Sequence, residues 1–167
     1  MSKTIAKIII GAFIVLLLFI GLLYYTLCAK VTNVSDEEPY SGVINKKLCL
    51  VKDVFITKSR EVDAYANPYL ISEIQDDSSA RSLSGYILPK GTAIKIYEAN
   101  IYKNGVSGFA QAYVLGTVYI KELSKEVHFE YNWGQSHVTI YSEQDDYWTF
   151  PLAPWQTDTE PGKFYFD

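Results

Sequence analysis

The chain has 167 residues, a formal net charge of −4 and two cysteines. Residues 1–30 carry three lysines and no acidic residue, whereas residues 31–167 carry twelve basic and nineteen acidic residues, a formal charge of −7. The negative charge of residues 31–167 argues against nucleic acid as a partner, because nucleic acid is itself negatively charged. Two cysteines are too few for a domain that depends on a disulfide framework.

The first element is an uncharged apolar stretch, IIIGAFIVLLLFIGLLYYTL, which runs from Ile8 to Leu27. Twenty helical residues extend about 30 Å, which matches the hydrocarbon thickness of a bilayer. A lone segment in hydrocarbon satisfies its backbone hydrogen bonds by forming a helix. We therefore expect a single transmembrane helix over residues 8–28, and we expect these residues to be the contact with membrane lipid.

The charges on either side of this stretch predict its direction. Lys3 and Lys7 precede it, and an acidic run at residues 36–38 follows it. Because positive charge is retained inside, residues 1–7 are expected in the cytoplasm and the C-terminal domain in the periplasm or outside the cell. The apolar core is longer than the roughly 7–15 residues of a cleaved signal peptide. We therefore favour an uncleaved signal-anchor, with cleavage near Ala29 and lipidation of Cys28 as the alternatives.

Residues 29–47 are polar, and we interpret them as a spacer between the membrane and a β domain over residues 48–167. Cys49 lies in an apolar run at the start of that domain. We expect it to be a buried free thiol, because free cysteine behaves as a small apolar residue. A disulfide between Cys28 and Cys49 is the alternative.

The domain is expected to be all-β. In residues 93–102, Ile94 and Ile96 share one face while Lys95 and Tyr97 take the other, which is the period of a half-buried strand. An Asn-Gly pair at residues 104–105 predicts a turn, and a second long strand, with Gly116 as a candidate bulge, is expected over residues 109–120. Further strands are expected over 48–57, 127–133, 147–150 and 163–167. Short strands between turn residues predict a small barrel or a sandwich.

One stretch of the domain carries a family resemblance. Residues 85–96, GYILPKGTAIKI, contain a Leu-Pro-Lys-Gly-Thr turn that leads into the alternating strand. This stretch resembles bacterial SH3-like domains, and the resemblance covers about residues 46–120. It implies a small, strongly bent β-barrel that binds cell-wall or protein ligands. The chain departs from the family's closing Gly-Trp and Gly-Tyr-Val pattern, with residues 109–114 in its place, so the ligand type stays open.

Three residues are candidates for a metal or proton-transfer site. His128 and Glu130 are two positions apart on an expected strand and therefore point the same way. If the chain turns between Trp133 and Gly134, Glu130 lies opposite His137, and two imidazoles and a carboxylate meet. The alternative is a solvent-facing cross-strand pair. We expect no metal and no cofactor. His128, Glu130 and His137 are the only candidate metal ligands that the sequence offers.

The densest aromatic cluster lies near the C-terminus and comprises Tyr147, Trp148, Phe150 and Trp155. These four residues are our candidate binding residues, since Trp and Tyr are typical anchors of protein interfaces. The alternative is that the cluster caps one open end of the barrel.

These patterns predict a membrane-anchored, non-enzymatic module of the cell envelope that binds another envelope protein or a cell-wall ligand through a β edge or an aromatic patch. An immunity or inhibitor protein that neutralises a toxin or a wall-degrading enzyme is the first alternative, because an acidic body suits a basic partner. A metal-dependent envelope hydrolase that uses His128, Glu130 and His137 is the second.

Overall fold

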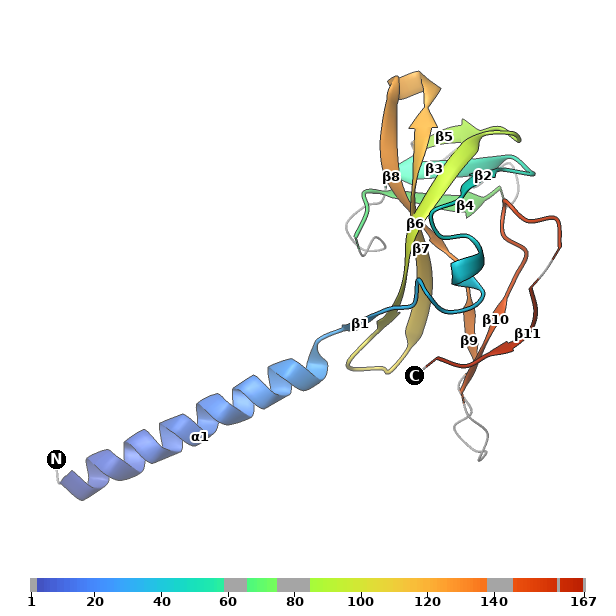
Figure 1. Ribbon diagram of the computed structural model, residues 1–167. Helices are drawn as coiled ribbons and strands as arrows, with labels where there is room; N and C mark the ends of the chain where they lie inside the picture. The colour runs from blue at the N-terminus through green and yellow to red at the C-terminus, as the bar shows by residue number, and fades with distance from the viewer. Residues whose placement is uncertain (1–2, 59–65, 75–84, 138–145, 159, 167) are drawn as a thin grey trace. The chain divides into compact units, whose positions relative to one another are not determined.

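The computed structural model describes residues 3–58, 66–74, 85–137, 146–158 and 160–166 (Figure 1). These residues form two compact units. The first contains Met1–Lys30 and Lys103–Ala110, and the second contains Val31–Tyr102 and Gln111–Asp167. We call the first the anchor unit and the second the body.

The anchor unit contains helix α1, Lys3–Leu27. Its segment Ile9–Leu27 is long and apolar enough to cross a membrane, which agrees with the expected single N-terminal span. Thr26 closes the last turn, because its hydroxyl donates hydrogen bonds to the carbonyls of Leu22 and Leu23 at 3.1 and 2.9 Å.

The body is built on an eight-stranded sheet. Its strands are β1 (Lys30–Asn33), β2 (Lys47–Cys49), β3 (Val54–Lys58), β4 (Tyr69–Glu73), β5 (Gly85–Leu88), β6 (Ala93–Lys103), β7 (Ala110–Ile120) and β8 (Lys125–Asn132). They follow the order β1-β6-β7-β8-β4-β3-β5, and β2 also pairs with β6. The β4–β8 ladder is parallel, with Tyr69 opposite Phe129. In Figure 1, β3, β4 and β5 run crosswise to β6, β7 and β8.

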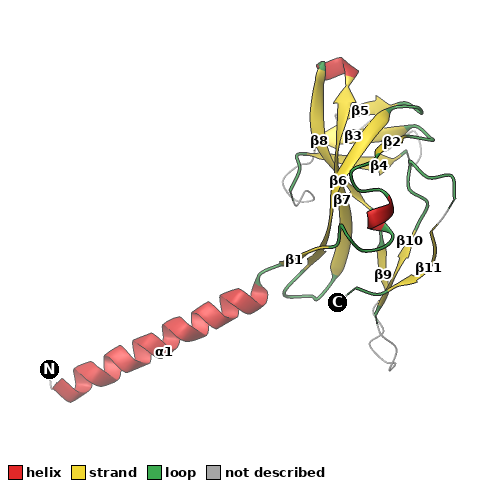
Figure 2. Cartoon of the chain, in the orientation of Figure 1, coloured by secondary structure: helices red, strands yellow, loops and turns green. Residues whose placement is uncertain are grey.

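A second sheet has the order β11-β10-β9, with β9 at Gln135–His137, β10 at Tyr147–Phe150 and β11 at Glu160–Phe164. Two short 3₁₀ helices complete the described part of the body: η1, Tyr40–Gly42, and η2, Lys121–Leu123 (Figure 2). The prediction of a β-rich body behind one apolar helix is therefore confirmed. Barrel closure is not found, because no ladder joins β1 to β5 among the strands described.

The long strands agree with their sequence pattern. Ile94 and Ile96 in β6 are buried, and Lys95 between them is exposed, as the alternation predicts. Gly116 is not a bulge, because the β7–β8 ladder is continuous from Tyr113 to Ile120. Glycine is required there for a different reason: an added Cβ would lie 2.5 Å from a ring carbon of Phe129.

The segment expected to be a spacer is part of the body. Val34, Tyr40 and Val43 are all buried, and the Tyr40 hydroxyl donates a hydrogen bond to the carbonyl of Trp133 at 3.1 Å. The prediction failed because these apolar residues are irregularly spaced among polar ones, so neither strand nor helix periodicity marks them.

The expectation for Cys49 was half wrong. Both cysteines are free, but Cys49 is exposed rather than buried. It lies on β2 opposite Ala93 of β6, and Lys47 on the same strand is also exposed. Residues two apart on a strand share a face, so the thiol lies on the solvent side with Lys47.

Candidate functional site

The aromatic residues predicted to bind a partner form a second core. Trp148, Phe150 and Trp155 are buried, and only Tyr147 is partly exposed. Ring centroids of Trp133 lie 5.2 Å from Phe150 and 5.5 Å from Trp155, in edge-to-face geometry. Such pairs stabilise a folded core. The described chain therefore does not present these three side chains as a docking surface.

One polar atom in this core has no partner among the described residues. The indole nitrogen of Trp155 is buried and makes no hydrogen bond. The indole nitrogen of Trp133, in contrast, donates to the carbonyl of Pro151 at 3.0 Å. An unpaired buried donor costs stability, so Trp155 is kept for the packing of its ring.

The three residues of the candidate metal site are not brought together. His128 and Glu130 lie on β8, as expected, but β9 pairs with β10, so His137 lies opposite Tyr147 and not opposite Glu130. The His137 ring stacks on Tyr147 at 4.7 Å, and its Nε2 lies 2.9 Å from the Thr149 hydroxyl. Within the described ranges, no group of three His, Cys, Asp or Glu side chains has the spacing of a metal site.

Glu130 has a structural role in this geometry. The residue is fully buried, and its Oε1 accepts hydrogen bonds from the backbone N–H groups of Ala66 and Asn67. The Asn67 side chain donates to the Tyr97 hydroxyl at 3.2 Å, and that hydroxyl lies 3.3 Å from Nδ1 of His128. Glu130 thus holds the chain before β4 against β8, with no solvent access for acid–base chemistry.

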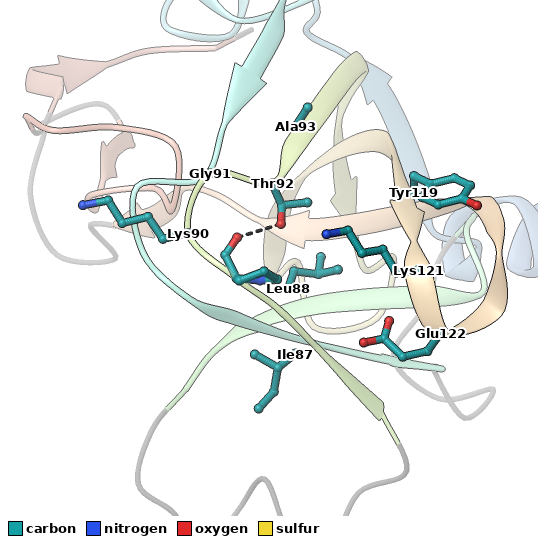
Figure 3. A pocket seen from close by; sticks show the side chains of 10 residues that line it. Ile87, Leu88, Lys90, Gly91, Thr92, Ala93, Tyr119, Lys121 and Glu122 are labelled. Carbon is teal, nitrogen blue, oxygen red and sulfur yellow. Dashed lines mark hydrogen bonds between the residues drawn. The ribbon is translucent and has the colours of Figure 1, made fainter.

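A pocket of about 420 Å³ lies where β5, the turn after it and the end of β7 meet (Figure 3). We call it the β5 pocket. It is lined by Ile87, Leu88, Pro89, Lys90, Gly91, Thr92, Ala93, Tyr119, Lys121 and Glu122. The turn that resembles SH3-like domains therefore forms one wall, and β7 with η2 forms the other.

The turn wall is fixed by local hydrogen bonds. The Thr92 hydroxyl donates to the carbonyl of Pro89 at 2.7 Å, which is the dashed line in Figure 3. The backbone N–H of Lys90 donates to the Asp53 carboxylate at 2.7 Å, and that of Gly91 donates to the carbonyl of Leu50 at 2.7 Å. Gly91 has φ +87°, a conformation that glycine adopts without strain. This wall is a preformed surface.

The opposite wall supplies charge and an aromatic ring. In Figure 3, Lys121 extends toward Thr92, while Lys90 points away from the centre of the pocket. Glu122 lies on the same wall as Lys121. Tyr119 is 54% exposed and Ile87, on the turn side, is also 54% exposed. The pocket thus combines exposed apolar surface with one ammonium and one carboxylate, which suits binding of a mixed polar and apolar chain.

The pocket adjoins a sheet edge. β5 is the last strand in the sheet order and forms an antiparallel ladder with β3, with Ile87 opposite Phe55. On the side away from β3, no described strand pairs with it. An edge strand of this kind offers backbone N–H and C=O groups to an incoming strand.

Sequence reasoning located half of this site. The turn at residues 88–92 was singled out by its resemblance, but Tyr119, Lys121 and Glu122 were not. Tyr119 lies near the end of β7, and Lys121 and Glu122 follow that strand in η2. Only the pairing of β6 with β7 returns these residues to the turn. Lys121 and Glu122 looked like an ordinary charged turn in the sequence, so no local signal marks them.

Comparison of the chain with known proteins gives no relative: no protein-family model, no curated protein and no solved structure matches it.

Proposed function

We propose that this protein is a non-enzymatic binding module, anchored by α1, that captures an extended segment of another envelope protein. Its N-terminus lies in the cytoplasm and its body lies in the periplasm or outside the cell. The captured segment adds a strand to β5, and one of its side chains enters the β5 pocket.

The observation that carries this proposal is the position of the pocket at an edge strand. Strand addition gives affinity through backbone hydrogen bonds, and an adjacent pocket gives specificity through one side chain. Ile87 lies on β5 and also lines the pocket, so one ligand can engage both. The aromatic patch is a weaker choice, because three of its four residues are buried.

Two further features support the proposal. The Leu88–Thr92 turn lines the pocket, and its resemblance to bacterial SH3-like domains implies binding of protein or cell-wall ligands. The ammonium of Lys121 favours a ligand with a carboxylate near the apolar side chain that enters the pocket. Glu122 beside it disfavours a second acidic group at that point.

The experiment is site-specific photocrosslinking in native membranes with the full chain. A photoreactive amino acid replaces Ile87 or Tyr119, and Thr157, which is exposed and lies outside the pocket, is the control position. We expect one protein partner at positions 87 and 119 and none at 157, with the adduct identified by mass spectrometry. Adducts of equal yield at all three positions, or none at any, would contradict the proposal. Wall fragments in place of a protein would assign a cell-wall ligand instead.

A pair of lysine variants tests the role of charge. Lys121 lines the pocket and Lys125 does not, although both are exposed. We expect Lys121→Glu to lower the crosslinking yield at Ile87, while Lys125→Glu leaves it unchanged. Equal yields from the two variants would remove Lys121 from the proposed site.

The acidic body supports a second candidate, an immunity or inhibitor protein. Residues 31–167 carry nineteen acidic and twelve basic side chains, so a basic enzyme is attracted to the body electrostatically. In that case the crosslinked partner is a toxin or a wall-degrading enzyme, and deletion of this gene alone kills the host. Survival of the host with that enzyme still active would dispose of this candidate.

A further inference from the structure

The loop between β6 and β7 belongs to the anchor unit together with α1. Its backbone is held by the Asn104 side chain, whose Oδ1 accepts the N–H groups of Val106 and Ser107 at 2.8 and 3.0 Å. The N–H of Asn104 donates to the carbonyl of Phe109, and the N–H of Gly108 donates to the carbonyl of Asn104, both at 2.9 Å. The loop Lys103–Ala110, which we call the β6–β7 tip, is therefore an ordered structure.

The tip packs directly on the end of α1. A Cβ added to Gly105 would lie 2.5 Å from the carbonyl oxygen of Cys28 and 2.7 Å from that of Leu27. These are backbone atoms that cannot rotate away, so only glycine permits the contact. The expected Asn-Gly turn therefore uses its glycine for close approach, while the positive φ in this loop, +69°, falls at Gly108.

The length of the helix fixes the depth of that contact. The apolar segment Ile9–Leu27 has 19 residues, which extend about 28 Å at 1.5 Å per residue. That length nearly equals the hydrocarbon thickness of about 30 Å, so Leu27 and Cys28 lie at its boundary when α1 spans the bilayer. A loop in backbone contact with these two residues then lies at the headgroup level.

The side chains of the anchor unit suit that level. Val106 and Phe109 on the tip are 75% and 60% exposed, and Tyr24 and Tyr25 near the helix end are also exposed. Aromatic residues are enriched at the membrane interface. Two lysines of the anchor unit, Lys30 and Lys103, lie at this end of α1, and every acidic residue of the chain lies in the body. This charge suits the phosphate groups of lipids.

We infer that the β6–β7 tip is a second membrane-binding element, which inserts Val106 and Phe109 among the lipid headgroups at the outer end of α1. The occupant of this surface is a phospholipid bilayer. The inference rests on the anchor in the proposed function and is independent of the β5 pocket.

The test measures the depth of a spin label in vesicles. The full chain, with Cys28→Ser and Cys49→Ser, receives a single cysteine by Val106→Cys or, as control, by Tyr165→Cys, an exposed body residue. Both proteins are reconstituted in vesicles of phosphatidylethanolamine and phosphatidylglycerol, and flotation is checked first. We expect the label at 106 to be several-fold more accessible to oxygen than to a water-soluble nickel chelate, and the label at 165 to show the reverse.

A glycine pair tests the contact that sets the depth. Gly105→Ala places a Cβ against the helix end, whereas the added Cβ of Gly42→Ala meets nothing closer than 4.0 Å. In the Val106→Cys protein, Gly105→Ala should shift the label toward the accessibility seen at 165, and Gly42→Ala should not.

Two results overturn the inference in distinguishable ways. If the chain floats with the vesicles but the labels at 106 and 165 have the same accessibility, the tip does not bind lipid and the anchor stands. If the chain does not float, the anchor fails and the inference fails with it. Crosslinking at Ile87 reports on the β5 pocket in either case.

Discussion

Replacement of Tyr40 tests whether the segment before β2 holds the body together. Tyr40 is fully buried, and its ring makes edge-to-face contacts with Trp133 and Phe150 at centroid distances of 5.6 and 5.3 Å. Its hydroxyl donates to the Trp133 carbonyl at 3.1 Å. One side chain thus joins the N-terminal part of the body to β10 and to the residue that follows β8.

The structure separates two contributions to its stability. Tyr40→Phe keeps the ring and removes one buried hydrogen bond, which should cost about 1–2 kcal/mol, since the carbonyl of Trp133 loses a donor. Tyr40→Ala also removes the ring and leaves a cavity, which should cost about 3–5 kcal/mol. A domain is typically stable by only about 5–15 kcal/mol, so the alanine variant loses a large share of the total.

The assay is urea unfolding of the full chain in detergent micelles, followed by tryptophan fluorescence. The fluorescence of Trp133 reports on the packing around Tyr40, because the two rings are in contact. The control is Tyr119→Ala, where the tyrosine is exposed and the expected change is within about 0.5 kcal/mol. If Tyr40→Ala costs no more than Tyr119→Ala, residues 31–47 are a spacer after all and the reasoning is refuted.

Two further outcomes follow from buried groups in the body. Burial raises the pKa of Tyr40 and of Tyr131 above the ordinary 10.0, and for Tyr131 the Glu73 charge adds to the effect. The unfolded tyrosines lose their protons first, so the contribution of Tyr40 and Tyr131 to the free energy of unfolding should be constant below about pH 10 and fall above it by about 1.4 kcal/mol per pH unit for each tyrosine. Urea unfolding between about pH 9 and pH 11 measures this slope, and Tyr40→Phe should make it shallower, because the contribution of Tyr40 is removed; an unchanged slope refutes the assignment. Gly116→Ala should destabilise the body by about 1–3 kcal/mol in the same assay, because the added Cβ meets the ring of Phe129 at 2.5 Å, and a neutral substitution would show that this ring moves freely.

Local pattern was enough to predict the elements that do not depend on distant partners. The apolar composition of residues 8–27 specifies a helix without reference to the rest of the chain, and α1 covers them. The alternation of Ile94 and Ile96 marks β6, and Pro151 ends β10 because proline cannot donate to a ladder. In each case the cause lies within a few residues of the effect.

The pairing between strands that are far apart in the sequence could not be predicted from the sequence. The parallel ladder that joins Tyr69 to Phe129 and Leu70 to Glu130 connects residues that are 60 positions apart in the sequence. Nothing in either strand specifies the other. The same limit applies to His137: a turn between Trp133 and Gly134 was the condition for placing it opposite Glu130, whereas the chain continues into a second sheet.

The aromatic cluster shows why the density of a residue type does not predict its role. Trp148 and Phe150 alternate with Tyr147 and Thr149 on β10, so the two pairs lie on opposite faces of the strand. The sequence does not predict that the face with Trp148 and Phe150 is the buried one. That face is covered by Tyr40 and Trp133, which come from other parts of the chain. A partner that used Trp148, Phe150 and Trp155 would first have to expose them, at a cost of about 1.5–3 kcal/mol for each side chain. The β5 edge requires no such opening, since Ile87 and Tyr119 are already exposed, and a ligand bound there should leave the tryptophan fluorescence of the body unchanged.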